Sequence, residues 1–297
     1  MSATDYVIVA AIGVASVLVL SIGLSWVFAR LYGRPTRVAL AETPADYGLP
    51  FVPVTFASQG VPLDGWFIAA DPAGVDSPPS VIIAHGWSRN KARMLPVAAL
   101  LHEAGFGLLL FDARGHGASG SDGAITILKF AEDIVSAVRF LEGHPRVDPT
   151  RLGVVGHSIG GAAAIVAASM EPKIQAVVTS SAFADPVSLT RRFMRNFHLP
   201  RGPFLWLICR IIDYYLGTTM TEVAPQNRIS RVEVPVLLIH GADDRMVPVS
   251  DMEAIYARAQ PQRTHRMVLA GRGHSDVITD SRYGTAVIEF LQASLCA

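Results

Sequence analysis

Short apolar runs alternate with longer helical patterns along most of this chain, and that alternation limits the possible folds more than any other feature. The runs are rich in valine, isoleucine and leucine, as strands buried on both faces of a sheet are. They lie at 81–84, 107–111, 152–155, 176–180, 235–240 and 266–270. Helical patterns lie between and after them, at about 91–104, 127–142, 158–170, 250–259 and 283–295. This order predicts an α/β fold with a mostly parallel sheet flanked by helices.

Two segments depart from that alternation. The runs "FVPVTFAS" and "LDGWFIAA" are joined by Gln59-Gly60 and predict an antiparallel hairpin at the start of the domain. Between the strand that ends at Ser180 and the one that starts at Pro235, roughly fifty residues intervene, which is far more than an ordinary crossover needs. We therefore expect a helical cap insertion at about 185–230.

The N-terminal segment carries no charged residue from Tyr6 to Ala29. As a helix rising about 1.5 Å per residue, it is long enough for a hydrocarbon core of roughly 30 Å. We expect a membrane anchor at 1–33, a proline- and glycine-containing linker at 34–50 and a folded domain at 51–297. The alternative is a cleaved signal peptide, because 27–29 resembles a small-residue cleavage site, but a basic n-region is missing and the apolar stretch is too long.

Charge places the domain relative to the membrane. Arg30, Arg34 and Arg37 follow the span and no basic residue precedes it, so the positive-inside rule predicts that the folded domain is cytoplasmic. The 25 basic and 25 acidic residues balance, so we expect membrane lipid around the helix but no nucleic-acid partner. Cys209 and Cys296 form neither a disulfide framework nor a metal-ligand spacing.

The segment "GHSIGG" at 156–161 follows one predicted strand and precedes an alanine-rich helix. In an open α/β sheet, ligands bind beyond the carboxyl ends of the strands. Gly156 and Gly160 have no Cβ, so this turn can tighten and lift the Ser158 hydroxyl clear of the sheet. We interpret Ser158 as a nucleophile rather than a helix cap.

A serine nucleophile needs a base. His274 follows the strand at 266–270, so it shares the sheet edge of Ser158. His265 precedes that strand and belongs to the opposite edge, whereas His240 ends a strand and is expected to pack or bond locally. His274 is the predicted general base.

The base in turn needs a carboxylate that orients its imidazole. Asp243 and Asp244 directly follow the strand at 235–240, and Asp185 follows another strand on the same side. Position alone leaves these three aspartates open.

Acyl transfer also needs hydrogen-bond donors for the oxyanion, each worth roughly 10² to 10³ in rate. The expected donors are the backbone N–H groups of Ile159, just after the nucleophile, and of Trp87, in the loop after the strand at 81–84. Trp87 alternatively serves only as a wall of the pocket, and the two roles are compatible.

At these motifs the chain resembles the α/β-hydrolase superfamily, over about residues 51–297. Within it, the chain is similar to the serine aminopeptidase-like and monoacylglycerol-lipase-like branch of esterases. The matching segments are "HGWSRNK", "FDARGHGASG", "DPTRLGVVGHSIGG", "HGADDRMVP" and "GRGHSD". The family pattern HGxxDxxVP falls on 240–248 and favours Asp244 over Asp243 as the acid.

The resemblance implies a serine hydrolase that cleaves carboxylic esters through an acyl-enzyme, with Ser158, His274 and Asp244 as its catalytic triad. It implies that Asp112, Arg114 and Gly115 support the wall of the active site. No cofactor or metal is expected.

The predicted insertion bears on the substrate. Its apolar run at 203–217, "PFLWLICRIIDYYLG", suits an acyl chain or simply packs on the domain. We therefore expect a small-molecule substrate, a lipid-like or medium-chain ester. Arginines scattered through the insertion also fit anionic lipid headgroups. The alternatives are a thioester or a small peptide cleaved by the same triad, and a non-catalytic membrane-bound scaffold.

Overall fold

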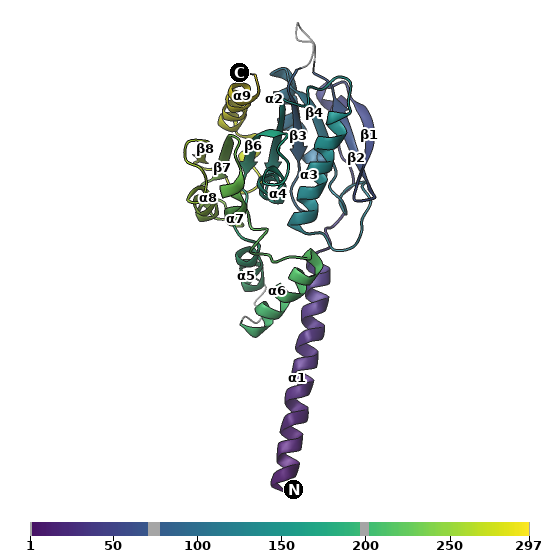
Figure 1. Ribbon diagram of the computed structural model, residues 1–297, viewed down its shortest axis with the longest axis vertical. Coiled ribbons are helices and arrows are strands. Elements are labelled where there is room, and N and C mark those ends of the chain that lie inside the picture. The colour runs from purple at the N-terminus through teal and green to yellow at the C-terminus, as the bar shows by residue number, and fades with distance from the viewer. Residues whose placement is uncertain (1, 71–77, 197–201, 297) are drawn as a thin grey trace.

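The computed structural model describes residues 2–70, 78–196 and 202–296. A long helix, α1 (Ala3–Tyr32), projects from one end of an α/β domain (Figure 1). The sheet of this domain has eight strands in the order β1-β2-β4-β3-β5-β6-β7-β8. Its helices flank the sheet, so the predicted fold class is confirmed.

The strands from β3 to β8 pair in parallel, and only the first two run against their neighbours. Their bounds are β1 Val52–Ser58, β2 Val61–Ile68, β3 Ser80–Ala84, β4 Gly107–Phe111, β5 Leu152–His157, β6 Ile174–Ser180, β7 Val236–Gly241 and β8 Thr264–Leu269. The predicted hairpin is β1-β2. Its two turn residues, Gln59 and Gly60, both have positive φ, which matches the right-handed twist of the strands they join.

The predicted helices are present, with ends that differ by a few residues. They are the 3-10 helix η2 (Lys91–Met94) leading into α2 (Leu95–Glu103), then α3 (Ile127–Glu142), α4 (Ile159–Ala168), α8 (Val249–Tyr256) and α9 (Ser281–Leu295). Side chains cap α3 and α9. Thr126 accepts from the Lys129 N–H at the start of α3, and Asp280 accepts from the Arg282 N–H at the start of α9.

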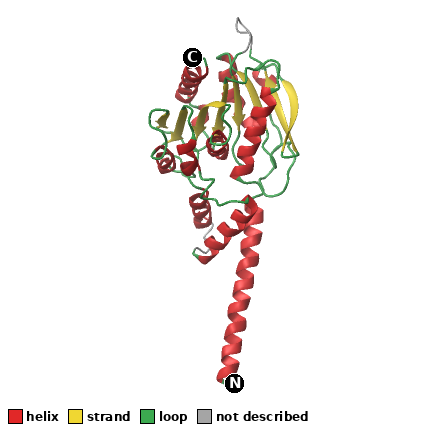
Figure 2. Ribbon diagram, in the orientation of Figure 1, coloured by secondary structure: helices red, strands yellow, loops and turns green. Residues whose placement is uncertain are grey.

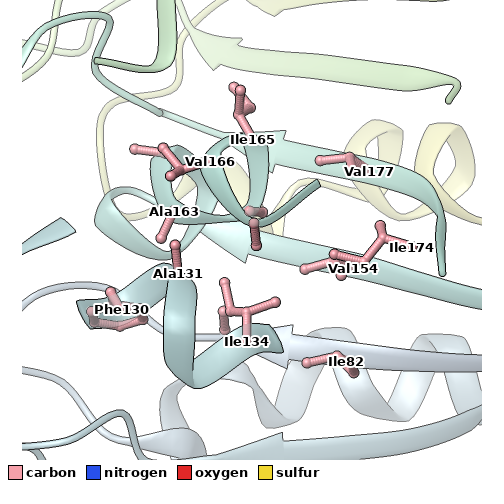
Figure 3. Close-up of a cluster of buried hydrophobic side chains, with 14 of the residues drawn as sticks. Ile82, Phe130, Ala131, Ile134, Val154, Ala163, Ile165, Val166, Ile174 and Val177 are labelled. Atoms are coloured by element: carbon pink, nitrogen blue, oxygen red, sulfur yellow. The ribbon is translucent and has the colours of Figure 1, made fainter. Parts of the chain in front are cut away.

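Alternate residues of the central strands enter different cores. Along β3, Ile82 and Ala84 pack with α3 and α4, whereas Val81 and Ile83 belong to the core that contains α2 and α9. Figure 3 shows the first of these cores, in which apolar side chains of α3 and α4 lie against β3, β5 and β6. Because apolar cores cover both faces of the sheet, we look for reactive polar side chains at the ends of the strands.

The segment between β6 and β7 is where a helical cap insertion is predicted, at about 185–230. Its elements are α5 (Pro186–Asn196), α6 (Pro203–Leu216), α7 (Pro225–Arg228) and the 3-10 helix η3 (Ile229–Arg231). Figure 2 shows that α5 and α6 lie at the end of the domain from which α1 projects. A small apolar cluster, which includes Met194 and Ile208, packs against Phe28 of α1. Residues 197–201 of the insertion lie outside the described residues.

Helix α1 is long and apolar enough to cross a membrane, a property that anchors and signal sequences share. Its large apolar side chains from Tyr6 to Leu24 are exposed, whereas Ser25, Ala29 and Gly33 are buried. These three residues recur every fourth position and therefore lie on one face. Among the described residues, those of α1 that are buried lie in its last two turns.

Candidate active site

Ser158 stands between β5 and α4 with φ 56° and ψ −120°, a backbone conformation that residues other than glycine rarely adopt. Neighbouring glycines make this turn possible. A Cβ on Gly156 would overlap the backbone of Gly160. A Cβ on Gly160 would lie 2.5 Å from the carbonyl oxygens of both Ala84 and His85. The turn is thus pressed against the end of β3, which lifts the serine above the sheet.

The structure brings together the three side chains that the resemblance named. Nε2 of His274 lies 3.0 Å from Oγ of Ser158, and Nδ1 of His274 lies 2.7 Å from Oδ2 of Asp244. The other carboxylate oxygen of Asp244 accepts hydrogen bonds from the N–H groups of Met246 (2.9 Å) and Val247 (2.8 Å). With the Nδ1 proton donated to Asp244, Nε2 is left with a lone pair that faces the serine hydroxyl.

Asp244 is held in its ionised form. Burial opposes ionisation, but the neighbouring imidazoles of His240 and His274 and the N–H of Val247 outweigh it, so the pKa of Asp244 lies below its usual range. The carboxylate therefore carries a negative charge at neutral pH, where it stabilises a positive charge on His274.

The other aspartates that the sequence left open lie elsewhere. Asp243 is exposed, and Asp185 caps α5 by accepting from the N–H and hydroxyl of Ser188. His240 bonds locally, as expected: its Nε2 lies 2.8 Å from the carbonyl oxygen of Val247. Of the three aspartates, Asp244 alone contacts His274 in the described part of the chain.

A second histidine, His157, lies directly beside the serine and is buried. Its ring centre is 5.2 Å from that of His274, and its Nδ1 is 3.2 Å from Oγ of Ser180. Burial, reinforced by repulsion from His274, lowers the pKa of His157 to about 3. His157 is therefore neutral at pH 7 and adds no charge next to the candidate base.

The loop after β3 passes close to Ser158. A Cβ on Gly86 would lie 3.5 Å from Cβ of Ser158, which places the next residue, Trp87, beside the serine. Within the described ranges, neither the N–H of Trp87 nor that of Ile159 donates a hydrogen bond. Both N–H groups are thus without a hydrogen-bond acceptor in this part of the chain. The indole of Trp87 also packs against His116, with ring centres 5.4 Å apart, and lines a cavity, so it forms part of a wall as well.

The residue that fixes this loop, Lys91, was not predicted from the sequence. The side chain of Lys91 is fully buried and forms ion pairs with Asp64 and, at 2.8 Å, with Asp112. Asp112 also accepts from the backbone N–H of Lys91 (2.7 Å) and of Ala118 (3.0 Å). The pair therefore ties the loop after β3 to the loop after β4. The only signal in the sequence was the lysine that ends "HGWSRNK".

The resemblance also named Arg114, which lies in the same buried layer. Its guanidinium pairs with Asp133 at 2.7 Å and donates to the hydroxyl of Ser58 at 2.7 Å. Asp112 and Arg114 thus support loops around the site without contacting Ser158 or His274.

A cavity of about 570 Å³ opens at Ser158 and Ile159. Its walls include Trp87, residues 124–127, parts of α5 and α6 and, unexpectedly, the end of α1. Sequence analysis had given that end only the role of an anchor. The lining residues from α1 and the segment after it are Ala29, Leu31, Gly33, Arg34 and Thr36.

The described residues contain no group of three or more histidine, cysteine or acidic side chains arranged to hold a metal ion. Cys209 is buried and Cys296 is exposed, and both are free thiols.

Comparison with known proteins supports the resemblance to the α/β-hydrolase superfamily. A family model described as serine aminopeptidase, S33 matches residues 77–207, a range that contains Trp87 and Ser158 but not Asp244 or His274. An uncharacterized protein of Mycobacterium tuberculosis is 31% identical over 225 residues, which cover 75% of this chain and 72% of that protein. The uncharacterized protein YfhR of Escherichia coli O157:H7 is 30% identical over 247 residues, which cover 80% of this chain and 79% of that protein.

Among solved structures, the Pyrococcus furiosus esterase Pf2001 superposes with a TM-score of 0.70 at 26% identity. The superposition covers 88% of this chain and all of the esterase.

Proposed function

This chain belongs to the α/β-hydrolase superfamily, and on that premise we propose that it is a serine esterase that cleaves lipid-like or medium-chain carboxylic esters. One observation carries the proposal: Ser158, His274 and Asp244 form a continuous hydrogen-bonded chain where a largely apolar cavity opens. The similarity to an archaeal esterase supports it.

In the proposed reaction, Oγ of Ser158 attacks the ester carbonyl while Nε2 of His274 takes the hydroxyl proton. Asp244 stabilises the imidazolium that forms. The oxyanion accepts hydrogen bonds from the N–H groups of Trp87 and Ile159. The imidazolium then protonates the leaving alcohol and the acyl-enzyme remains. Water, deprotonated by His274, attacks the acyl-enzyme, and the acid and free Ser158 result.

The cavity favours an ester over a peptide with a free amino terminus. An aminopeptidase must bind a positively charged α-amino group, for which a carboxylate is the natural partner. The described residues that line the cavity include no aspartate or glutamate, and they do include Arg34 and Arg192. Arg192 is itself neutralised by Asp251, with contacts of 3.0 and 2.7 Å. The other walls are mostly apolar, which suits an acyl chain.

We further propose that α1 is retained as a membrane anchor, with the domain in the cytoplasm. Cleavage after Ala29, the site that the sequence offers to a signal peptidase, would remove Phe28, which packs against the cluster around Met194. It would also remove Ala29 from the wall of the cavity. A segment built into the domain in this way fits an anchor better than a leader peptide.

Hydrolysis of p-nitrophenyl esters of graded chain length by the full chain in detergent micelles tests the esterase proposal. We expect turnover by the wild type and a loss of about 10⁶ in kcat for Ser158→Ala, the scale seen when a triad serine is removed. A fluorophosphonate probe, which reacts only with an activated serine, should label the wild type and not the variant.

The rival functions give different results. Turnover of acyl thioesters or of aminoacyl amides in preference to oxygen esters, with Ser158 labelled, would replace the ester substrate and keep the mechanism. Absence of both turnover and labelling would refute the proposal that this protein is an enzyme and would favour a membrane-bound scaffold.

A further inference from the structure

The end of α1 is part of the cavity wall and not merely close to it. Ala29 and Gly33 are buried, and both line the cavity together with Thr36. Position 33 tolerates no side chain, because a Cβ there would lie 2.9 Å from Cβ of Ala124. This contact joins the helix end to the residues at 124–127 that form the adjacent wall.

Hydrogen bonds hold the segment after α1 on the loops that surround Ser158. The carbonyl of Gly33 accepts from the N–H of Ile125 at 2.7 Å. The N–H of Thr36 donates to the hydroxyl of Ser88, the residue after Trp87, at 3.0 Å. The side chain of Asn90 donates to the carbonyls of Val38 and Ala39, each at 3.1 Å. The juxtamembrane segment is thus bonded to the loop that carries Trp87.

The cavity lies at the level where α1 leaves a bilayer. About twenty residues at 1.5 Å each cross a hydrocarbon core of roughly 30 Å, so a span that begins near Tyr6 ends near Trp26. The guanidinium of Arg30 lies over the ring of Trp26, 5.1 Å from its centre, and such residues mark the membrane–water boundary. Ala29 and Leu31, within the next helical turn, line the cavity.

Helix α6 lies beside this boundary and presents aromatic side chains outward. It contacts α1 (Figure 1), and Trp206 and Tyr214 are 65% and 83% exposed. Aromatic residues of this kind are typical of membrane interfaces. Leu31 lines the cavity and is also 63% exposed, so the cavity opens on this side. Met246, whose N–H donates to Asp244, also lines the cavity and is 61% exposed, so the cavity is open to water there too.

We propose that the last turn of α1 and the segment 33–36 form the outer wall of the acyl site, and that the substrate is an acyl ester resident in the membrane whose chain enters beside α1. This inference rests on the proposed esterase function and names the source of its substrate. The anchor then helps to bind the substrate in addition to tethering the enzyme.

Two substitutions on the same helix test the wall. Ala29→Phe places a ring in the cavity, whereas Ala15→Phe, at an exposed position in the span, is the matched control. With full-length protein in micelles, we expect Ala29→Phe to lower kcat/KM for p-nitrophenyl dodecanoate relative to the acetate by about tenfold or more, the scale of losing chain contacts in an apolar pocket. Ala15→Phe should leave that ratio unchanged, and an unchanged ratio in Ala29→Phe would overturn the proposal.

A second variant tests the same wall at an exposed position, where a substitution should not disturb folding. Leu31→Gln alters an exposed residue at the opening and should also lower the dodecanoate-to-acetate ratio. Fluorophosphonate labelling of Ser158 reports whether each variant keeps an active site. If the wild type hydrolyses the acetate ester and is labelled, but neither variant changes the dodecanoate-to-acetate ratio, the proposal for the wall is refuted. The esterase proposal is then retained. If the wild type shows neither turnover nor labelling, the esterase proposal fails as well.

A separate measurement tests the route by which the substrate enters the cavity. The full chain is reconstituted in phosphatidylcholine vesicles that contain a monoacylglycerol, and inert lipid is added at constant bulk substrate concentration. Entry from the bilayer predicts that the rate falls in proportion to the mole fraction of substrate in the membrane. A rate that follows bulk concentration instead would place entry at the Met246 edge and overturn the membrane route.

Discussion

Two adjacent aspartates that share a sequence motif have different surroundings in the structure. Asp243 is exposed, whereas Asp244 is buried, accepts two backbone N–H groups and contacts His274. At the residue scale, this contrast supplies a matched pair of substitutions.

We predict that Asp244→Asn lowers kcat for a short-chain ester by about 10⁴, because an amide stabilises the wrong tautomer of the imidazole and no longer balances its positive charge. Asp243→Asn should keep kcat near the wild-type value. Steady-state kinetics on both variants measures this. Equal losses in the two, or a loss confined to Asp243→Asn, would reassign the acid.

Sequence analysis found the residues that lie at the ends of strands and missed those fixed by long-range pairing. Ser158 and His274 could be predicted because each directly follows a recognisable strand and must therefore lie at one edge. Lys91 could not, because its burial depends on Asp64 of β2 and on Asp112, which follows β4. No local pattern distinguishes such a lysine from a solvated one.

At the scale of elements, the contact between the β5–α4 turn and the end of β3 leaves no space for a methyl group. We predict that Gly160→Ala lowers the free energy of unfolding by about 1 to 3 kcal/mol, since the clash is with backbone carbonyls of Ala84 and His85, which cannot rotate away. The same variant should lower kcat, because the shift moves Ser158.

Gly143→Ala is the control for that substitution. Gly143 ends α3 with a φ of −84°, and a Cβ there would lie 3.8 Å from its nearest neighbour, the carbonyl of Phe140. Its stability should remain within about 0.5 kcal/mol of the wild type. Chemical denaturation in detergent gives both values. A Gly160→Ala protein as stable and active as Gly143→Ala would show that the turn is not closely packed.

The elements themselves were largely predictable, because continuous apolar runs specify buried strands and their spacing specifies the crossover helices. The position of α1 against the domain was not. Ser25, Ala29 and Gly33 are small residues within an apolar helix, and their spacing fits a lipid-facing surface as well as a packed one. Contacts with α6 and with the residues at 124–125, which come from distant parts of the sequence, decide that this face is buried.

At the scale of the whole molecule, buried neutral histidines make stability depend on pH. Burial, with a further contribution from His85, lowers the pKa of His116 to about 3, and His157 is lowered similarly. An unfolded histidine titrates near 6.5. Between these values the unfolded chain binds more protons than the folded one, so the free energy of unfolding falls as the pH is lowered from about 6.5 toward 3.

We predict that His116→Phe reduces this acid slope by about 1.4 kcal/mol per pH unit, the contribution of one proton. The replacement is apolar and can pack against Phe130 and Trp87, at the cost of the bond between Nδ1 and the carbonyl of Arg114. Denaturation at several pH values measures the slope. Above pH 7 the two proteins should show parallel curves. An identical slope below pH 6 would mean that His116 is protonated in the folded state.

The two native cysteines allow the membrane orientation to be tested without introducing another cysteine. Cys296 is exposed and Cys209 is buried in the cluster beside α1, so a thiol reagent should reach the first and spare the second. Arg30, Arg34 and Arg37 lie on the domain side of the span, and the positive-inside rule therefore places Cys296 in the cytoplasm. We predict that a membrane-impermeant maleimide leaves the protein unlabelled in intact cells and labels it after permeabilisation, with Cys296→Ser as the unlabelled control. Labelling in intact cells would reverse the orientation. On the proposal that the end of α1 forms the wall of the acyl site, the cavity would then face lipids of the outer leaflet.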